Sequence, residues 1–564
     1  MALLPVNPES GGGAPDEGPP SARSLPAAVA PLVWAAALLA LSRSASGVRV
    51  LPVLEVLRGP AGLLLAALAA ALSLAAFLPP PRMRSVSPRL LFGAAWAFLV
   101  VVGLSYTLRL RVSGDEPHYL LMAQSLWREH DLDLRDNHAR EDWREYTPGP
   151  IVPHYAAPRA DGRPFPAHSP GLPLLLAPLY ALGGRPLCVV VLTLAAALLA
   201  LEMWRAARRL TGDDEAALLA WALALVPPVA FYAFEIYTEV PAALALAVAL
   251  RLLLTGSGLG IGGAAAAALL ASALPWLHLK MLPAAVALAV IALFRLRGRG
   301  RILFFGVAAL MAVAFLAYYR AIFGVASPLA IYGGVPRDAD GSPLRARVGL
   351  ALDRSFGLLP YAPLFLIALA GLGRLVRLRA WEPLLAGAAV IVPVLPWRMW
   401  WGGQCPPARF LVPLVPVLAL ALAARVTLSR TGLARWRWPL ALLGVAATIG
   451  MTVRPAALLL LNRGDRPTRL WTALSGERPI AIYLPSLAAN TPDEWRVATV
   501  WLAALAFLVG LDVWARRRPR IDYLFRGLGL PIVLMLGIGI AVDTWARRAP
   551  PENTKAVTPE EPPE

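Results

Sequence analysis

The chain has 564 residues, 58% of them hydrophobic, and a formal net charge of +18 at pH 7. Its mean hydropathy of +0.60 and repeated apolar runs of about 17 to 25 residues exclude an ordinary soluble protein, because such runs can cross a bilayer as helices. The arginines stand at the ends of these runs, so the charge indicates membrane topology and no nucleic-acid partner. Two cysteines, Cys188 and Cys405, are too few for a disulfide framework or a cysteine metal site.

In chain order, the apolar runs predict an all-α polytopic membrane protein with about 13 to 15 transmembrane helices. Continuous apolar runs, rather than short alternating segments, speak against a β-barrel. The Gly/Pro-rich residues 1–24 are expected to form a disordered cytoplasmic tail. The predicted spans are 26–44, 60–79, 90–109, 186–204, 215–231, 240–255, 262–277, 281–296, 302–320, 356–373, 382–398, 409–425, 439–461, 497–515 and 527–545.

Arginine clusters set the orientation of these spans. They lie at 82–89, 205–209, 295–301, 374–379, 425–437 and 516–520, all on one side of the predicted membrane. By the positive-inside rule that side is cytoplasmic, so the long first loop, 110–170, lies outside. A composition rich in Ala, Pro and Gly with only two lysines is typical of a high-GC bacterium. We therefore expect a multi-pass protein of the bacterial inner membrane.

The apolar run 171–182 is too short to span, and its Pro173 and Pro178 would break a long helix. We expect it to lie in the membrane interface or to re-enter the bilayer.

The outer loop 110–170 opens with an acidic pair, Asp115 and Glu116, directly before Pro117. Proline is favoured in the first turn of a helix, so a helix should start here, with His118 and Tyr119 in its first turns. The apolar positions that follow have helical spacing, which predicts an amphipathic helix on the membrane surface. The two carboxylates either cap this helix or act chemically.

Five of the six histidines also lie in this loop. No two of them have the short spacing of zinc ligands on one helix, so the sequence predicts no metal ligand among them. Residues 131–137 carry carboxylates that could hold a hard divalent cation, but their alternation with leucine fits a partly buried strand equally well. No cofactor is predicted firmly, and a divalent cation stays an alternative.

Three further outer segments carry candidate residues. Glu235 and Glu239 precede Pro241 at a helix start, where a capping role is again the alternative. His278 and Lys280 follow an apolar run, and a single membrane-embedded lysine in an arginine-rich chain indicates a site for a compact ammonium, unless it was retained by chance.

The third segment runs from Trp400 and Trp401 through a Gly-Gly pair to Arg409. It would bind a sugar or an anion, or the tryptophans would only anchor the protein at the interface.

These pieces, in this order, resemble the GT-C class of polytopic glycosyltransferases, in the branch of the protein O-mannosyltransferases and the aminoarabinose transferase. The resemblance rests on the acidic pair, Pro170-Gly171-Leu172-Pro173, Tyr237-Thr238-Glu239, the segment 319–324, and Trp401-Gly402-Gly403 leading to Arg409. It covers about residues 90–425, which would be the catalytic membrane core. Residues 25–89 would add two N-terminal helices, residues 426–545 would be C-terminal helices with an outer loop at 462–496, and residues 546–564 a disordered acidic outer tail.

The resemblance implies inverting transfer of a sugar from a polyprenyl-phosphate carrier to a lipid, glycan or protein acceptor on the outer, periplasmic face. The chain departs from the pattern in its Asp-Glu pair and its two extra N-terminal spans. In this scheme Asp115 and Glu116 are catalytic. Lys280, Arg409, His278 and Arg320 bind the donor phosphate, and Glu239, Glu235, His118, Tyr119, Trp400 and Trp401 contact substrate. A transporter or lipid flippase, and a structural or assembly protein of the membrane, are the alternatives.

Overall fold

The structure is a computed structural model, and it describes residues 25–77, 86–112, 114–147, 149–156, 162–332, 341–453, 468–525 and 529–546. The predicted tails, 1–24 and 546–564, lie outside these residues, except for Ala546 at the end of α21. Within the described ranges every regular element is a helix, and the extended backbone is limited to an isolated bridge between Tyr155 and Pro166. The all-helical class predicted from the apolar runs is confirmed.

The N-terminal half contains α1 (Leu25–Arg43), α2 (Ala45–Val50), α3 (Pro60–Phe77), α4 (Pro88–Thr107), α5 (Glu116–Arg128), α6 (Arg135–Ala139), α7 (Gly171–Thr211), α8 (Asp214–Ala222), α9 (Val229–Tyr232), α10 (Glu239–Leu254) and α11 (Ile261–Leu277). The C-terminal half contains α12 (Leu282–Arg295), α13 (Gly298–Phe323), α14 (Pro343–Leu352), α15 (Phe365–Arg377), α16 (Trp381–Ile391), α17 (Val415–Leu428), α18 (Arg437–Val453), α19 (Arg469–Leu474), α20 (Pro492–Arg517) and α21 (Gly529–Ala546). Short 3-10 helices that matter below are η2 (Pro52–Arg58), η3 (Asp142–Glu145), η5 (Leu279–Met281) and η8 (Arg409–Leu414).

By length and composition, five helices of the described chain can cross a membrane, or six if the bent pair η2 and α3 counts as one span. The five are Pro88–Thr107, Gly171–Thr211, Gly298–Tyr332, Arg409–Leu428 and Pro492–Arg517, and four shorter apolar helices accompany them. The number is below that of the apolar runs because several runs form helices of fewer than 18 residues, such as α10 and α12, and others are divided. The run 215–231, for example, becomes α8 and α9, with a turn that contains Pro227 and Pro228 between them.

The run 171–182 forms the first part of α7 and is separated from the rest by a kink. Gly183 and Gly184 have non-helical backbone angles, and Gly184 has a φ of +58°. The break therefore lies at this glycine pair and not at Pro178, which stays inside the helix. Glycine tolerates the left-handed conformation that the kink needs, whereas other residues adopt it at a cost.

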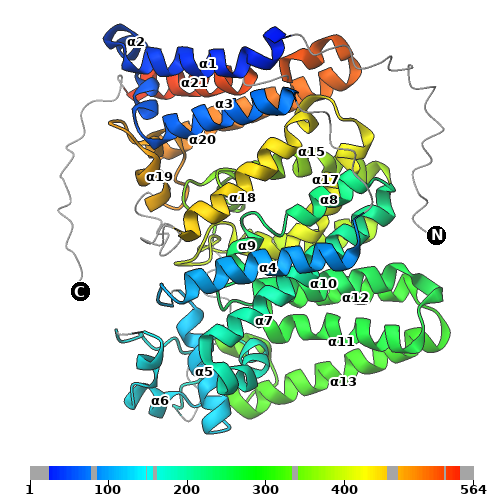
Figure 1. Cartoon of the computed structure of the whole chain (residues 1–564). Helices are drawn as coiled ribbons and strands as arrows, with labels where there is room; N and C mark the ends of the chain where they lie inside the picture. The colour runs from blue at the N-terminus through cyan, green and yellow to red at the C-terminus, as the bar shows by residue number, and fades with distance from the viewer. Residues whose placement is uncertain are drawn as a thin grey trace.

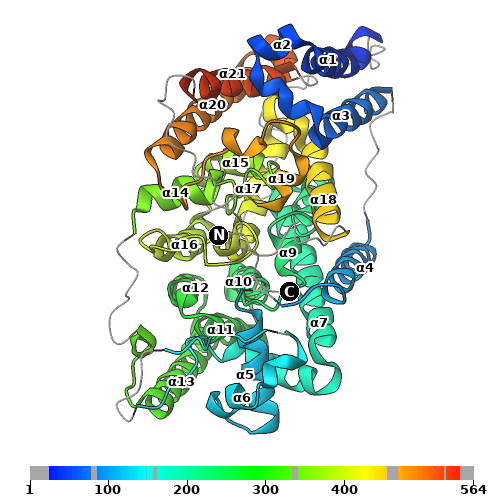
Figure 2. The same ribbon diagram turned by 90° about the vertical axis from the view of Figure 1, so that its left-hand side faces the viewer.

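Helix α7 is central to the fold, because α4, α5, α8, α10 and α17 all pack against it. Figures 1 and 2 show α1 and α3 beside α20 and α21 at one end of the molecule, with α5 and the row α11 to α13 at the other. At the first end Leu38, Leu54, Ala69 and Ile532 share a small apolar core. The predicted outer loop lies beside α7, where α5 is packed.

Candidate functional site

Helix α5 begins at Glu116 with Pro117 in its first turn, as the sequence predicts. Asp115 is the N-cap residue, yet its carboxylate makes no capping hydrogen bond. Glu239 is the first residue of α10, and the preceding Thr238 provides no side-chain cap either. Both carboxylates point to other partners, so the capping interpretation does not account for them.

Those partners are two cations from distant parts of the chain. Arg409, the first residue of η8, places Nη2 2.6 Å from Asp115 Oδ2 and donates from Nε to Glu239 Oε1 at 2.8 Å. Lys280, in η5, donates from Nζ to the same Glu239 oxygen at 2.7 Å. We call Asp115, Glu239, Lys280 and Arg409 the charge cluster. Four segments that the sequence could group only by a shared membrane face thus meet by direct contact.

The charge cluster is largely shielded from water. The side chain of Glu239 is 0% exposed, that of Arg409 4% and that of Lys280 9%, whereas Asp115 keeps 23% of its side chain accessible. The two cations and two carboxylates balance in formal charge, which is what permits their burial. Asp115 is the member that an incoming molecule reaches most readily.

Aromatic rings and backbone groups fix the two cations. Lys280 Nζ lies 3.9 Å from the centre of the Phe410 ring, and the Arg409 guanidinium lies 4.5 Å from that of Tyr237. The Tyr237 hydroxyl also accepts a hydrogen bond from the Asp115 backbone N–H at 3.1 Å. Arg409 Nη1 donates to the Gly402 carbonyl at 2.9 Å. Since Arg409 uses three different nitrogens, lysine could not replace it by charge alone.

Two glycines allow the backbone to approach this closely. Gly114 has a φ of +55°, and a Cβ there would collide with the Tyr237 hydroxyl and the Gln404 carbonyl. Gly402 has a φ of +90°, and a Cβ there would lie 2.8 Å from Arg409 Cδ. Gly402, the first glycine of the Gly-Gly pair noted in the sequence, is therefore a packing requirement of the charge cluster.

The electrostatics of the charge cluster follow from these contacts. Burial by itself would raise the pKa of Asp115, but the Arg409 guanidinium outweighs burial and holds that pKa well below its usual value. Burial lowers the pKa of Lys280 to about 8, although the Glu239 carboxylate acts in the opposite direction. At neutral pH Asp115 is ionised and most Lys280 is protonated.

Glu116 and Glu235 belong to a second buried network. Glu116 accepts a hydrogen bond from the Ile236 backbone N–H at 2.9 Å and pairs with Arg185 at 3.4 Å. The Tyr106 hydroxyl donates to Glu235 at 3.2 Å. Both carboxylates are fully buried. This network joins α4, α5, α7 and the loop before α10.

The sequence did not single out Arg185, which lies just after the α7 kink. The available signal was an arginine on the predicted outer side, against the positive-inside pattern. Arg185 also borders a cavity of about 390 Å³ between the end of α4 and the kink. The cavity is lined by Thr107, Leu108, Arg109, Leu110, Arg111, Glu145, Tyr146, Tyr180, Gly184, Arg185 and Pro186.

Two of the predicted phosphate ligands differ in position. His278 lies two residues before Lys280, and its Nδ1 accepts the Lys280 backbone N–H at 3.2 Å, so it supports η5. Arg320, near the end of α13, is exposed, and no contact described for it reaches the charge cluster.

Two of the predicted sugar-binding residues are the tryptophans of the outer segment. Trp400 is buried against α14, where a Cβ on Gly349 would clash with its ring. Trp401 packs near Phe356 and Arg345.

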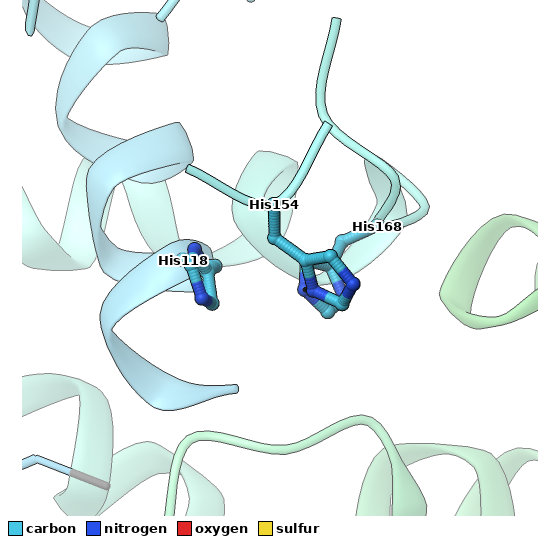
Figure 3. A group of neighbouring side chains, drawn as sticks. All are labelled: His118, His154 and His168. Atoms are coloured by element: carbon cyan, nitrogen blue, oxygen red, sulfur yellow. Dashed lines mark hydrogen bonds between the residues drawn. The ribbon is translucent and has the colours of Figure 1, made fainter. Parts of the chain in front are cut away.

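Tyr119 is buried, and its ring lies 4.8 Å from that of His168. Figure 3 shows His168 grouped with His118 and His154. The ligand atoms of these three residues lie within 4.8 Å of one another. The absence of a short histidine spacing, which argued against metal ligands, does not bear on this group. One of its members comes from α5 and two come from a pair of extended segments.

No protein-family model and no curated protein matches the chain. Among solved structures, it is similar to ArnT from Cupriavidus metallidurans bound to undecaprenyl phosphate, with 17% identity, a TM-score of 0.44, and 81% of this chain and 77% of that chain covered. It is also similar to the Archaeoglobus fulgidus oligosaccharyltransferase in the apo form, with 15% identity, a TM-score of 0.34, and 74% and 59% covered.

Proposed function

We propose that this chain is a membrane glycosyltransferase that moves a sugar from a polyprenyl-phosphate donor to an acceptor hydroxyl on the outer face of a bacterial inner membrane. The observation that carries the proposal is the contact of Arg409 with both Asp115 and Glu239, while Glu239 also holds Lys280. A carboxylate and two cations within one ion-pair network are the groups that such a transfer needs.

The chemistry is a direct displacement at the anomeric carbon. The acceptor oxygen forms the new bond to this carbon as the bond to the phosphate oxygen breaks, and the phosphate leaves with the electron pair. The acceptor proton passes to Asp115. Lys280 and Arg409 stabilise the charge that grows on the departing phosphate. Attack from the side opposite the leaving group inverts the anomeric configuration.

The resting ion pairs couple donor binding to the base. While Arg409 pairs with Asp115, the carboxylate has a low pKa and is a weak base. A donor phosphate competes with both carboxylates for Arg409 and Lys280. Once the phosphate has taken Arg409, Asp115 loses its cation and its pKa rises. In this scheme the base becomes effective only when donor is bound.

Asp115, rather than Glu116, is our choice for the base. The Asp115 side chain is partly accessible and sits on the phosphate-binding cations, whereas Glu116 is fully buried against Arg185 and the Ile236 backbone. Glu116 and Glu235 then position α5 against the loop before α10. All members of the charge cluster lie between residues 115 and 409, in agreement with a catalytic core at 90–425.

A transfer assay in proteoliposomes tests the proposal. Full-length protein receives a polyprenyl-phosphate sugar with a labelled sugar, and the release of the label from the lipid is followed with a panel of lipid and glycan acceptors. We expect Asp115→Asn to lower the rate by at least about 100-fold, the lower range for loss of a general base.

Asp133→Asn is the matched control, because Asp133 is in the same loop and pairs with Arg135 near the surface. Its rate should equal that of the wild type. Equal rates for Asp115→Asn and wild type would remove the base from the scheme, and a wild type that releases no sugar from any donor would refute the proposed function.

A further inference from the structure

Three histidines of the outer loop form a group that the proposed transfer does not use. His118 lies on the first turn of α5, and His154 and His168 lie on two segments that run side by side (Figure 3). Their ring centres are 5.0 to 5.4 Å apart. Each residue offers one ligand nitrogen, and the three ligand atoms lie no more than 4.8 Å from one another.

Backbone pairing explains why residues so far apart in sequence meet here. The Ala156 N–H donates to the Phe165 carbonyl at 2.8 Å, and the Ala167 N–H donates to the His154 carbonyl at 3.0 Å. This short antiparallel pairing brings His154 beside His168. His168 continues into the start of α7, and α5 packs against α7, which brings His118 to the same place. The three donors are thus held by two helices and one pair of extended segments.

The spacing of the nitrogens is close to that of a metal site. A tetrahedral Zn²⁺ with Zn–N bonds of about 2.0–2.1 Å needs ligand nitrogens about 3.3 Å apart. His154 Nδ1 and His168 Nε2 are already 3.2 Å apart. The distances from the His118 nitrogen to the other two must shorten by no more than about 1.5 Å, which a side-chain rotation can supply.

The bonding of the histidines also suits a metal. The His118 side chain makes no hydrogen bond with any described residue, and the contact between His154 and His168 uses one nitrogen of each. If the three histidines served only to hydrogen-bond one another, His118 would also take part.

We propose that His118, His154 and His168 form a binding site for a divalent transition metal of the Zn²⁺ class. Imidazole ligands favour Zn²⁺ and its first-row neighbours over Mg²⁺ or Ca²⁺, which prefer oxygen. Three protein ligands leave the fourth tetrahedral position to water or to a substrate oxygen, as in catalytic rather than structural zinc sites. A bound metal would link the two extended segments to α5 through His118, which is three residues after Asp115.

Metal binding to purified full-length protein tests this inference without any transfer assay, so its failure is distinct from failure of the proposed function. After removal of bound metal with a chelator, Zn²⁺ binding is titrated calorimetrically, and Co²⁺ is added separately to detect the visible bands of a four-coordinate imidazole site. We expect about one Zn²⁺ per chain.

His154→Ala and His118→Ala should each weaken Zn²⁺ binding by more than about 100-fold, since loss of even an indirect partner of a metal ligand costs 10- to 100-fold. His154 is exposed, so its replacement leaves the packing intact. His130→Asn is the matched control, from the same loop but outside the group. Its φ of 64° suits asparagine, and it should bind Zn²⁺ like the wild type. A wild type without a Zn²⁺ site, or equal affinity in the wild type and both alanine variants, would overturn the proposal.

Discussion

Replacement of Arg409 by methionine removes the central cation of the charge cluster while keeping much of the side-chain volume. Asp115 then loses the one ion pair that the described residues give it, and Glu239 keeps only Lys280. Breaking a buried pair by removing one partner typically costs 3–5 kcal/mol, and we expect a loss of about that size in the free energy of unfolding. The partial exposure of Asp115 places the expected loss nearer about 3 kcal/mol, because water can solvate that carboxylate.

Lys280→Met should cost less than Arg409→Met. It removes a single charged hydrogen bond, worth about 1.5–3 kcal/mol, and leaves Glu239 paired with Arg409. Adding Asp115→Asn to Arg409→Met should recover part of the loss, because no unpaired charge is then left at that position. Arg409→Met should therefore lose more stability than Lys280→Met because Arg409 makes more contacts in the charge cluster, whatever the absolute energies are.

Equilibrium unfolding in mixed detergent micelles, followed by tryptophan fluorescence, measures these differences. Arg398→Met is the matched control, since Arg398 is exposed in the segment that leads to Arg409, and its stability should stay within about 0.5 kcal/mol of the wild type. If Arg409→Met is as stable as this control, or if Lys280→Met is the less stable of the two cluster variants, the electrostatic reasoning is wrong.

Three further predictions concern single positions. Gly402→Ala should lower the rate of sugar transfer by at least about tenfold with little change in expression, because the new Cβ displaces Arg409 from its 2.9 Å contact with the Gly402 carbonyl. Steady-state rates check this prediction, and an unchanged rate would contradict it. Arg185→Met should lower the free energy of unfolding by about 3–5 kcal/mol, and adding Glu116→Gln should recover part of this loss. Equal stability of Arg185→Met and the wild type would refute a structural ion pair between Arg185 and Glu116. The affinity for the donor should decline as the pH rises through about 8, because Lys280 loses its charge there. The Lys280→Arg variant stays charged and should show no such decline. Matching pH profiles of donor affinity for the two proteins would exclude Lys280 as the titrating group.

The helices could largely be predicted from the sequence because the apolar runs end at residues that also end helices. The predicted span 262–277, for example, is α11 (Ile261–Leu277), and the predicted helix start at Pro117 is that of α5. Where the expectation differs from the structure, a local backbone feature decides. The first part of α7 ends at Gly183 and Gly184 and not at the prolines, because glycine accepts the left-handed angle.

The site was predictable in part. Topology grouped Asp115, Lys280 and Arg409 on one face. In the structure Lys280 and Arg409 contact Glu239 at 2.7 and 2.8 Å, and Arg409 contacts Asp115 at 2.6 Å. The sequence could not show that Glu116, next to Asp115, faces Arg185, because adjacent residues at a helix start point in different directions.

The histidine group was not predictable from spacing. His154 and His168 meet through hydrogen bonds between two extended segments, and His118 meets them only because α5 packs on α7. Contacts of this kind depend on tertiary structure and leave no short motif in the sequence.

Binding of polyprenyl phosphate tests the central claim most directly, because the charge cluster is proposed to hold the phosphate of the carrier. Affinity is measured for the full-length protein in lipid nanodiscs, with wild type, Lys280→Met and the control Arg398→Met. We predict that Lys280→Met binds roughly 10- to 150-fold more weakly, the equivalent of one charged hydrogen bond of 1.5–3 kcal/mol, while the control binds like the wild type. Equal affinity of Lys280→Met and the wild type, with both proteins folded, would contradict the account.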